Sequence, residues 1–222
     1  MVSGLCFAQY SNHQLYEAYT TRDMSVWENY IDSADWDRLD TEQRKQLLNY
    51  EYGFTAYMLG VDVEKSKQLI QRLETHIEQM KSALPEERYC VYLASVYTYR
   101  LALNKGQLMK YAKIVFSNIQ RAMEINPNDP FVLSMQGNVE FYSPFGSKKE
   151  ALVYYQKADS LYGVAGADYE RWNRRAVQMT YILCLHKLRR GKEAKKLCEE
   201  LLAEEPNNVN LQQLLKNLNA TN

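Results

Sequence analysis

The side chains that most often carry out chemistry are few and widely spaced in this sequence. Its three histidines, His13, His76 and His186, lie far apart, and none stands in an HExxH motif. The chain also contains no GxSxG motif, no glycine-rich phosphate loop and no kinase signature. We therefore expect no catalytic residues, no metal and no cofactor. A helical enzyme whose site only the fold would reveal is the alternative.

The cysteines point to packing rather than to reactivity. Cys90, Cys184 and Cys198 belong to no CxxC pair and no zinc-ligand spacing. Each lies in an amphipathic helical run, where a buried, small apolar residue is the usual role. Cys184 and Cys198 occupy the two halves of one predicted hairpin, so a disulfide between them remains open in an oxidising compartment.

One short segment concentrates positive charge. Residues 187–192 read KLRRGK, and Lys195 and Lys196 follow. Such a turn could contact phosphates or anionic lipid. The alternative is a solvated hairpin tip, and we favour it because no aromatic residue lies among these cations.

The zero net charge conceals an asymmetry along the chain. Residues 1–87 hold 8 Lys and Arg against 15 Asp and Glu, whereas residues 88–222 hold 19 against 12. Zero net charge gives no indication of a general polyanion binder, so we expect no nucleic-acid partner. Two solvated surfaces of opposite bias explain the asymmetry. Contact of the basic half with an acidic partner, or self-association through the opposed ends, are the alternatives.

The elements that must position these residues are helices. Apolar residues recur at i, i+3, i+4 and i+7 almost throughout, and no segment alternates with period two. Pro127 and the tetrapeptide Ser143–Gly146 interrupt the pattern, and Asp129 followed by Pro130 is typical of a helix start. The connections are short, which favours antiparallel neighbours. We predict helix pairs at 11–20 with 24–34, 40–59 with 62–82, 86–103 with 107–125, 130–142 with 147–161 and 168–189 with 192–204, and a cap helix at 207–218.

Several of these pairs share internal spacings. One set has steps of 4, 3, 3 and 2 residues and occurs twice, as Val115, Ile119, Ala122, Ile125, Pro127 and as Ala194, Cys198, Leu201, Glu204, Pro206. The fourth pair carries a fuller set: Tyr142, Gly146, Ala151, Tyr155, Ala158 and Leu161. With these residues the chain resembles the tetratricopeptide repeat (TPR) family, and the exported helical-repeat proteins of Gram-negative bacteria are similar in layout.

The resemblance implies an all-α fold, a right-handed superhelical array of antiparallel helix pairs that forms a TPR-like α-solenoid. It implies one helical-repeat domain over residues 9–222. In this family the first helix of each pair lines a concave groove that binds a protein or peptide, so a non-enzymatic scaffold or adaptor is expected. The alternative is a self-associating structural or assembly factor of the cell envelope, and homo-oligomerisation stays open.

The resemblance also selects candidate groove residues. Tyr, Arg and Gln side chains suit an extended peptide with acidic groups, because arginine binds carboxylates in bidentate fashion and tyrosine offers rigid contact area. Half of these residues could instead be seam or surface residues. The candidates are Tyr99, Arg100, Leu133, Gln136, Glu140, Arg174, Arg175 and Gln178.

The first residues, MVSGLCFAQ, bear on localisation. Cys6, Phe7 and Ala8 look like the end of a secretory signal with cleavage before Gln9, so residues 1–8 are read as a truncated signal-peptide remnant. This predicts export, most simply to the periplasm. An ordinary hydrophobic N-terminus of a cytoplasmic protein is the alternative. No apolar run approaches the length of a transmembrane helix.

Overall fold

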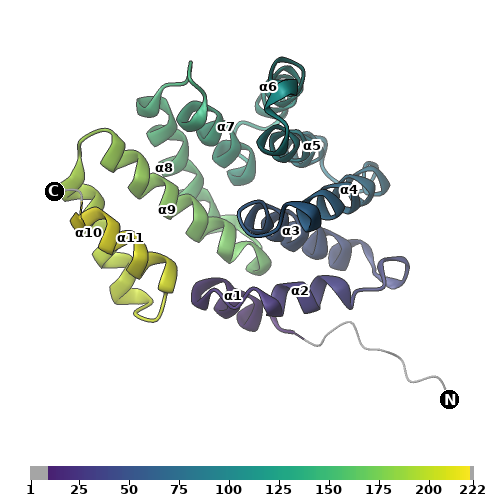
Figure 1. Ribbon diagram of the computed structural model, residues 1–222, viewed down its shortest axis with the longest axis horizontal. Coiled ribbons are helices and arrows are strands. Elements are labelled where there is room, and N and C mark those ends of the chain that lie inside the picture. Colours follow the sequence, from purple (N-terminus) through teal and green to yellow (C-terminus); the bar gives the residue numbers. More distant parts are fainter. Residues whose placement is uncertain (1–9, 221–222) are drawn as a thin grey trace. The chain divides into compact units, whose positions relative to one another are not determined.

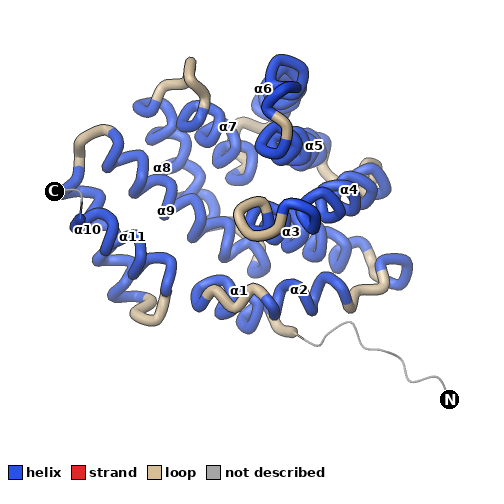
Figure 2. Tube along the Cα trace, in the orientation of Figure 1, coloured by secondary structure: helices blue, strands red, loops and turns tan. Residues whose placement is uncertain are grey.

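The computed structural model describes residues 10–220, which fold into helices joined by short connections (Figure 1, Figure 2). No strand occurs within this range. The helices group by their contacts into two compact units. The first comprises the residues up to Ala18 together with Asp23–Ile125, and the second comprises Tyr19–Arg22 together with Asn126–Asn222. Residues 1–8, predicted to be a signal remnant, lie outside the described range, and the single domain over 9–222 remains a prediction.

The helices of the first unit follow the predicted order, with ends shifted by at most a few residues. They are α1 (Asn12–Thr21), α2 (Ser25–Asp32), α3 (Thr41–Met58), α4 (Val63–Gln79), α5 (Glu86–Leu103) and α6 (Leu108–Ile125), with short 3₁₀ turns η1 (Trp36–Arg38) and η2 (Lys105–Gln107). The end of α1, from Tyr19 on, groups with the second unit.

The second unit is likewise a succession of helices joined by short connections. Its helices are α7 (Pro130–Tyr142), α8 (Lys148–Ala165), α9 (Arg171–Lys187), α10 (Gly191–Glu204) and α11 (Val209–Ala220), with the 3₁₀ turn η3 (Asp168–Glu170) before α9. Helix α8 runs past its predicted end at residue 161. Gly163 lies inside this helix.

Side-chain caps fix where the helices begin. Asp40 accepts a hydrogen bond from the Gln43 amide and Gln43 bonds back, which completes a capping box at α3. Asp129 accepts from the amides of Phe131 and Val132 at 2.8 and 3.1 Å, with Pro130 in the first turn of α7. The start predicted at Asp129 and Pro130 is therefore confirmed.

An aromatic cluster organises the core of the first unit. Trp27 of α2 packs edge-on against Tyr50 of α3 with ring centroids 4.9 Å apart, and Tyr30 contacts the same ring at 5.4 Å. The indole N–H of Trp27 donates to the Leu15 carbonyl at 2.7 Å, so its one polar atom is satisfied inside the core. These contacts fix α2 against α3 and α1.

The core of the second unit follows the small-and-large stripe expected on α8. Ala151, Tyr155 and Ala158 are fully buried, and Tyr162 is 5% exposed. The Tyr155 ring lies against Gly137 of α7, where an added Cβ would come within 2.7 Å of a ring carbon. Because Gly137 has no side chain, α7 and α8 can approach closely around this tyrosine.

The C-terminal helices form a second apolar cluster in this unit. It is built from α9, α10 and α11, and its buried members include Ile182, Leu185, Ala194, Cys198 and Leu211. Leu214 and Leu218 extend it along α11. Helix α11 therefore covers the apolar face of α10, as expected of a cap helix.

Candidate binding surfaces

Arg174 is a partly exposed candidate residue of the second unit. Its Nε donates to Asp159 Oδ1 of α8 at 2.8 Å, and its side chain is 43% exposed. The guanidinium lies flat against Gly163, because a Cβ there would be 3.0 Å from Nη2 and 3.1 Å from Cζ. Because Gly163 has no side chain, Arg174 of α9 can lie directly against helix α8. The result is a pre-oriented guanidinium, bonded to Asp159 through Nε and packed against Gly163.

Gln178 shares the same acceptor. Its side-chain amide donates to Asp159 Oδ1 at 2.8 Å, one turn along α9 from Arg174. Gln178 is 8% exposed, so it stabilises the Asp159 carboxylate from the buried side and offers little surface to a ligand. The fold has brought these two predicted residues together on one aspartate.

Arg175 points to the other side of α9 and is buried. Its side chain is 7% exposed and its Nη2 lies 2.8 Å from Glu205 Oε1 and 3.9 Å from Glu204 Oε2, just after and at the end of α10. A buried guanidinium held by a carboxylate joins two helices. Arg175 therefore presents no free face to solvent in this conformation.

The candidates on α7 form a local network at the turn into α8. Gln136 Nε2 donates to Glu140 Oε1 at 3.0 Å, and Glu140 Oε2 accepts from the Ser147 amide at 2.8 Å. Gln136 and Glu140 are half-buried. Leu133 is 1% exposed and packs in the interior. The polar pair on α7 thus steadies the α7–α8 connection.

The remaining candidates, Tyr99 and Arg100, lie on α5 in the first unit. Tyr99 is 7% exposed and its hydroxyl donates to the Tyr52 carbonyl at 3.1 Å. Burial raises the pKa of Tyr52 to about 12 and the pKa of Tyr99 well above its usual value, so both phenols stay neutral. Arg100 pairs with Glu74 of α4 and stands 5.3 Å from the centre of the Tyr97 ring.

The first unit also contains a cluster of titratable side chains that the spacing of sequence motifs did not reveal. His76 of α4 stacks on Trp36 with centroids 3.7 Å apart, and its Nδ1 lies 2.8 Å from Glu51 Oε2. Glu51 is 2% exposed and also lies 3.2 Å from Arg72 Nε. Glu51 and His76 come from different helices, 25 residues apart. A search for ligands within one helix therefore misses this pair.

Arg72 also borders a polar cavity of about 420 Å³ in the first unit. Its Nη1 donates to Asp32 at 2.9 Å, and Lys65 beside it pairs with Glu28. Arg72 is thus paired with another residue of the lining, whereas Lys65 is paired with a residue outside it. Within residues 10–220, no group of three or more His, Cys, Asp or Glu side chains is arranged to hold a metal ion.

The three cysteines of the described range are free thiols. Cys184 Sγ donates to the Lys148 carbonyl at 3.1 Å, and Cys198 Sγ contacts the Leu211 carbonyl at 3.5 Å. Burial raises the pKa of Cys198 to about 11, with a smaller contribution from Glu199. Neither thiol is bonded to the other, and both are protonated at neutral pH.

No protein-family model matches the sequence, and no curated protein matches it. Among solved structures, the HusA haemophore from Porphyromonas gingivalis has a similar fold, with a TM-score of 0.55 and 17% identity over 84% of this chain and 96% of that chain. The APC/C hetero-tetramer Cut9-Hcn1 aligns with a TM-score of 0.24 and 14% identity, over 93% of this chain and 48% of that chain, which is too low to indicate a shared fold.

The chain thus has an all-helical fold of helix pairs like that of the haemophore. Membership of the tetratricopeptide family and the superhelical arrangement remain predictions. Among the described residues, no helix combines the length and apolar character needed to cross a bilayer.

Proposed function

We propose that the protein is a non-enzymatic binding scaffold whose second unit recognises an acidic segment of a protein or peptide. The observation that carries the proposal is the orientation of Arg174. Asp159 and Gly163 hold its guanidinium in one place, and its side chain is 43% exposed. A pre-oriented arginine loses little conformational entropy on binding a carboxylate, which is the condition for selective recognition of acidic groups.

The experiment compares matched arginine variants in binding to immobilised acidic peptides. Arg174→Gln removes the oriented guanidinium, whereas Arg121→Gln removes an arginine that pairs with Glu86 in the first unit and is similarly exposed. Loss of a charge-assisted bond of about 1.5–3 kcal/mol predicts affinity reduced by about tenfold to a hundredfold for Arg174→Gln alone. Equal binding by the two variants, with unchanged melting temperatures, would remove Arg174 from the recognition surface.

Haem as cargo is the second candidate, because the solved structure of similar fold is described as a haemophore. The tyrosine hydroxyl is a known axial ligand of haem iron, and Tyr142 is 68% exposed at the end of α7. Absorbance titration of the protein with haemin tests this candidate. A saturable change in the haem spectrum that Tyr142→Phe reduces would support it, and a spectrum identical to that of free haemin would exclude it.

Export to the periplasm is the localisation that we propose for this scaffold. It rests on the signal-like residues Cys6, Phe7 and Ala8. Fractionation of native cells tests it, and recovery of the protein in the cytoplasmic fraction alone would contradict it.

A further inference from the structure

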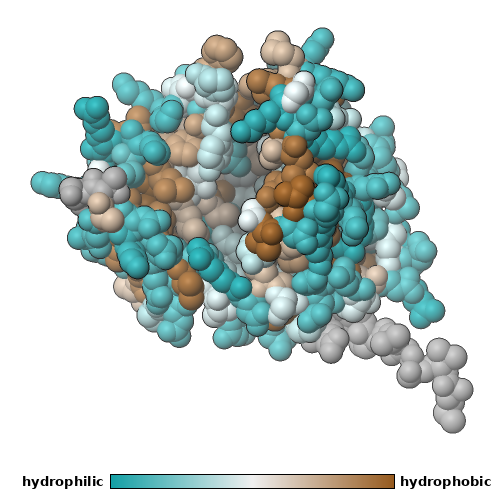
Figure 3. All heavy atoms as spheres, in the orientation of Figure 1, coloured by the Kyte–Doolittle hydropathy of each residue, from teal (hydrophilic) through white to brown (hydrophobic). Residues whose placement is uncertain are grey.

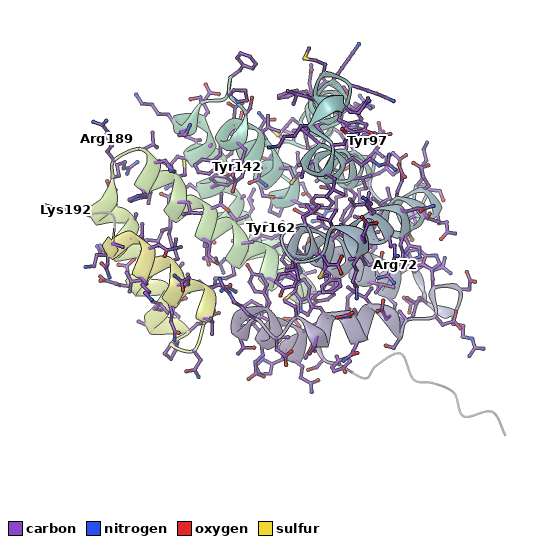
Figure 4. All side chains as sticks on the ribbon, in the orientation of Figure 1. Arg72, Tyr97, Tyr142, Tyr162, Arg189 and Lys192 are labelled. Carbon is purple, nitrogen blue, oxygen red and sulfur yellow. The ribbon has the colours of Figure 1, made fainter. Side chains whose placement is uncertain are left out.

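The positively charged turn between α9 and α10 keeps several cations free of partners. Arg190 makes a two-bond pair with Glu193 at 2.6 and 2.7 Å. Lys187, Arg189 and Lys192 are exposed, and none forms an ion pair with another described residue. Arg189 has a φ of 62°, and the next amide bonds back to the Leu185 carbonyl, so the turn has a defined shape. Figure 4 shows Arg189 and Lys192 on the outer side of this turn.

The start of α8 lies beside this turn and adds two more cations. The Lys148 carbonyl accepts a hydrogen bond from Cys184 near the end of α9, and Leu152 packs against the cluster that contains Ile182 and Leu185. The side chains of Lys148 and Lys149 are exposed and, within the described residues, without ion-pair partners. Glu150 contributes one negative charge to the same region, so cations remain in excess.

An exposed aromatic ring precedes these lysines directly. Phe145 is 96% exposed at the α7–α8 turn, which stands clear of the helices that it joins (Figure 2). Close contacts define the backbone of this turn. A Cβ on Gly146 would come within 2.3 Å of the Glu140 carbonyl oxygen, and the Phe145 amide donates to Ser143 Oγ at 3.2 Å. The backbone of the turn therefore has a defined shape, and the Phe145 ring that it carries is almost fully exposed.

The sequence alone argued for a solvated tip because no aromatic residue lies among the cations of the α9–α10 turn. The fold supplies that residue from the neighbouring turn. We name this surface the basic–aromatic end, consisting of Phe145, Lys148, Lys149, Lys187, Arg189 and Lys192. Figure 3 shows apolar side chains scattered over a largely hydrophilic surface. Among the exposed large apolar residues of the described range, Phe145 has the highest exposed fraction.

We propose that the basic–aromatic end docks the protein onto the surface of an anionic lipid bilayer. A projecting ring followed by two exposed lysines, with further cations on the turn beside the start of α8, matches a bilayer interface. There the ring would enter the boundary of the acyl chains and the cations would meet phosphate groups. A protein partner would more commonly offer the ring a pocket and would match fixed positive charges with fixed negative ones. The same charges would attract an acidic protein, and the test separates the two.

The test is co-sedimentation of the whole chain with vesicles of phosphatidylcholine alone or mixed with phosphatidylglycerol. We expect binding only to the mixed vesicles, weakened by salt. Lys187→Gln/Lys192→Gln should weaken binding about 30-fold, at about 1 kcal/mol for each cation near the surface. Phe145→Ser should weaken it about tenfold through the lost insertion of the ring.

Two controls match these variants. Lys113→Gln/Lys216→Gln removes the same charge from exposed lysines elsewhere, and Val164→Ser removes an 86% exposed apolar residue at the other end of α8. Both should bind as the wild type does. Equal losses in test and control variants, equal binding to both kinds of vesicle, or binding to a poly-glutamate peptide without binding to vesicles would each overturn the proposal.

Discussion

The contact between Gly137 and Tyr155 makes a sharp prediction about the α7–α8 seam. In Gly137→Ala, the new Cβ would lie 2.7, 2.9 and 3.2 Å from three carbons of the Tyr155 ring. Ordinary carbon contacts are about 3.5–4.0 Å, so the ring must move. It has little freedom to do so, because it is fully buried and its hydroxyl donates to Asn138 Oδ1 at 2.8 Å.

The magnitude follows from two opposing effects. Overpacking of this kind costs about 1–3 kcal/mol, whereas replacing glycine by alanine inside a helix returns up to about 1 kcal/mol. We expect a net loss of about 1–2 kcal/mol in the free energy of unfolding. For a chain of this size that lowers the melting temperature by about 2–8 °C.

Thermal unfolding followed by circular dichroism measures the effect, with Gly60→Ala as the control. A Cβ at Gly60 meets the Tyr57 carbonyl oxygen at an ordinary 3.8 Å, so that variant should be neutral or slightly stabilised. In Gly137→Ala/Tyr155→Leu the smaller side chain should relieve the clash and give a measurable coupling energy. A Gly137→Ala protein as stable as the wild type, with no coupling to position 155, would refute the reasoning.

Three further predictions concern stability and assembly. Arg175→Met should lower the free energy of unfolding by about 3 kcal/mol in chemical denaturation, because it removes the cation that pairs with Glu205 and leaves that carboxylate its hydrogen bond from Asn208. Arg174→Gln should cost less than about 1 kcal/mol, and similar losses for the two variants would contradict the different burial of the two arginines. The folded state holds the Cys198 proton more tightly than the unfolded chain does, so its contribution to stability is full below the pKa of the unfolded thiol and is lost as pH rises towards about 11. In chemical denaturation at rising pH, the free energy of unfolding should therefore fall less for Cys198→Ala than for the wild type. An equal fall with pH for the two proteins would contradict this prediction. If the opposed charges of the two halves of the chain drive self-association, light scattering should show larger species at low salt that dissociate as salt is added; a monomer throughout would exclude that alternative.

Local sequence signals were sufficient to place the helices. Asp129 and Pro130 specify the start of α7 through capping and a fixed φ, which need no knowledge of the rest of the chain. The stripe of Ala151, Tyr155 and Ala158 on α8 follows from helical spacing alone. The predicted end of α8 at residue 161 was less accurate, because the helix continues through Gly163 to Ala165 and Gly163 lies against Arg174 of the next helix.

The candidate binding residues were harder to predict because a difference of one residue rotates a helix face by about 100°. Arg174 and Arg175 are neighbours in sequence, yet one is exposed beside Asp159 and the other is buried against Glu205. Leu133 falls in the core for the same reason. The contact of His76 with Glu51 depends on two helices meeting, and periodicity within either helix carries no information about it.

The ion pairs between neighbouring helices have a consequence for how such a chain can evolve. Arg72 with Glu51, Arg174 with Asp159 and Arg175 with Glu205 each join two particular helices. The pairs that hold the buried Glu51 and Arg175 lie within α3–α4 and α9–α10, so loss of one helix of either pair would leave an uncompensated charge in an apolar interior. Loss or exchange of a whole pair removes both partners together, and only the more exposed contact of Arg174 with Asp159 crosses from one pair to the next. The helix pair is therefore the smallest piece of this chain that recombination could move without leaving a buried charge unmatched.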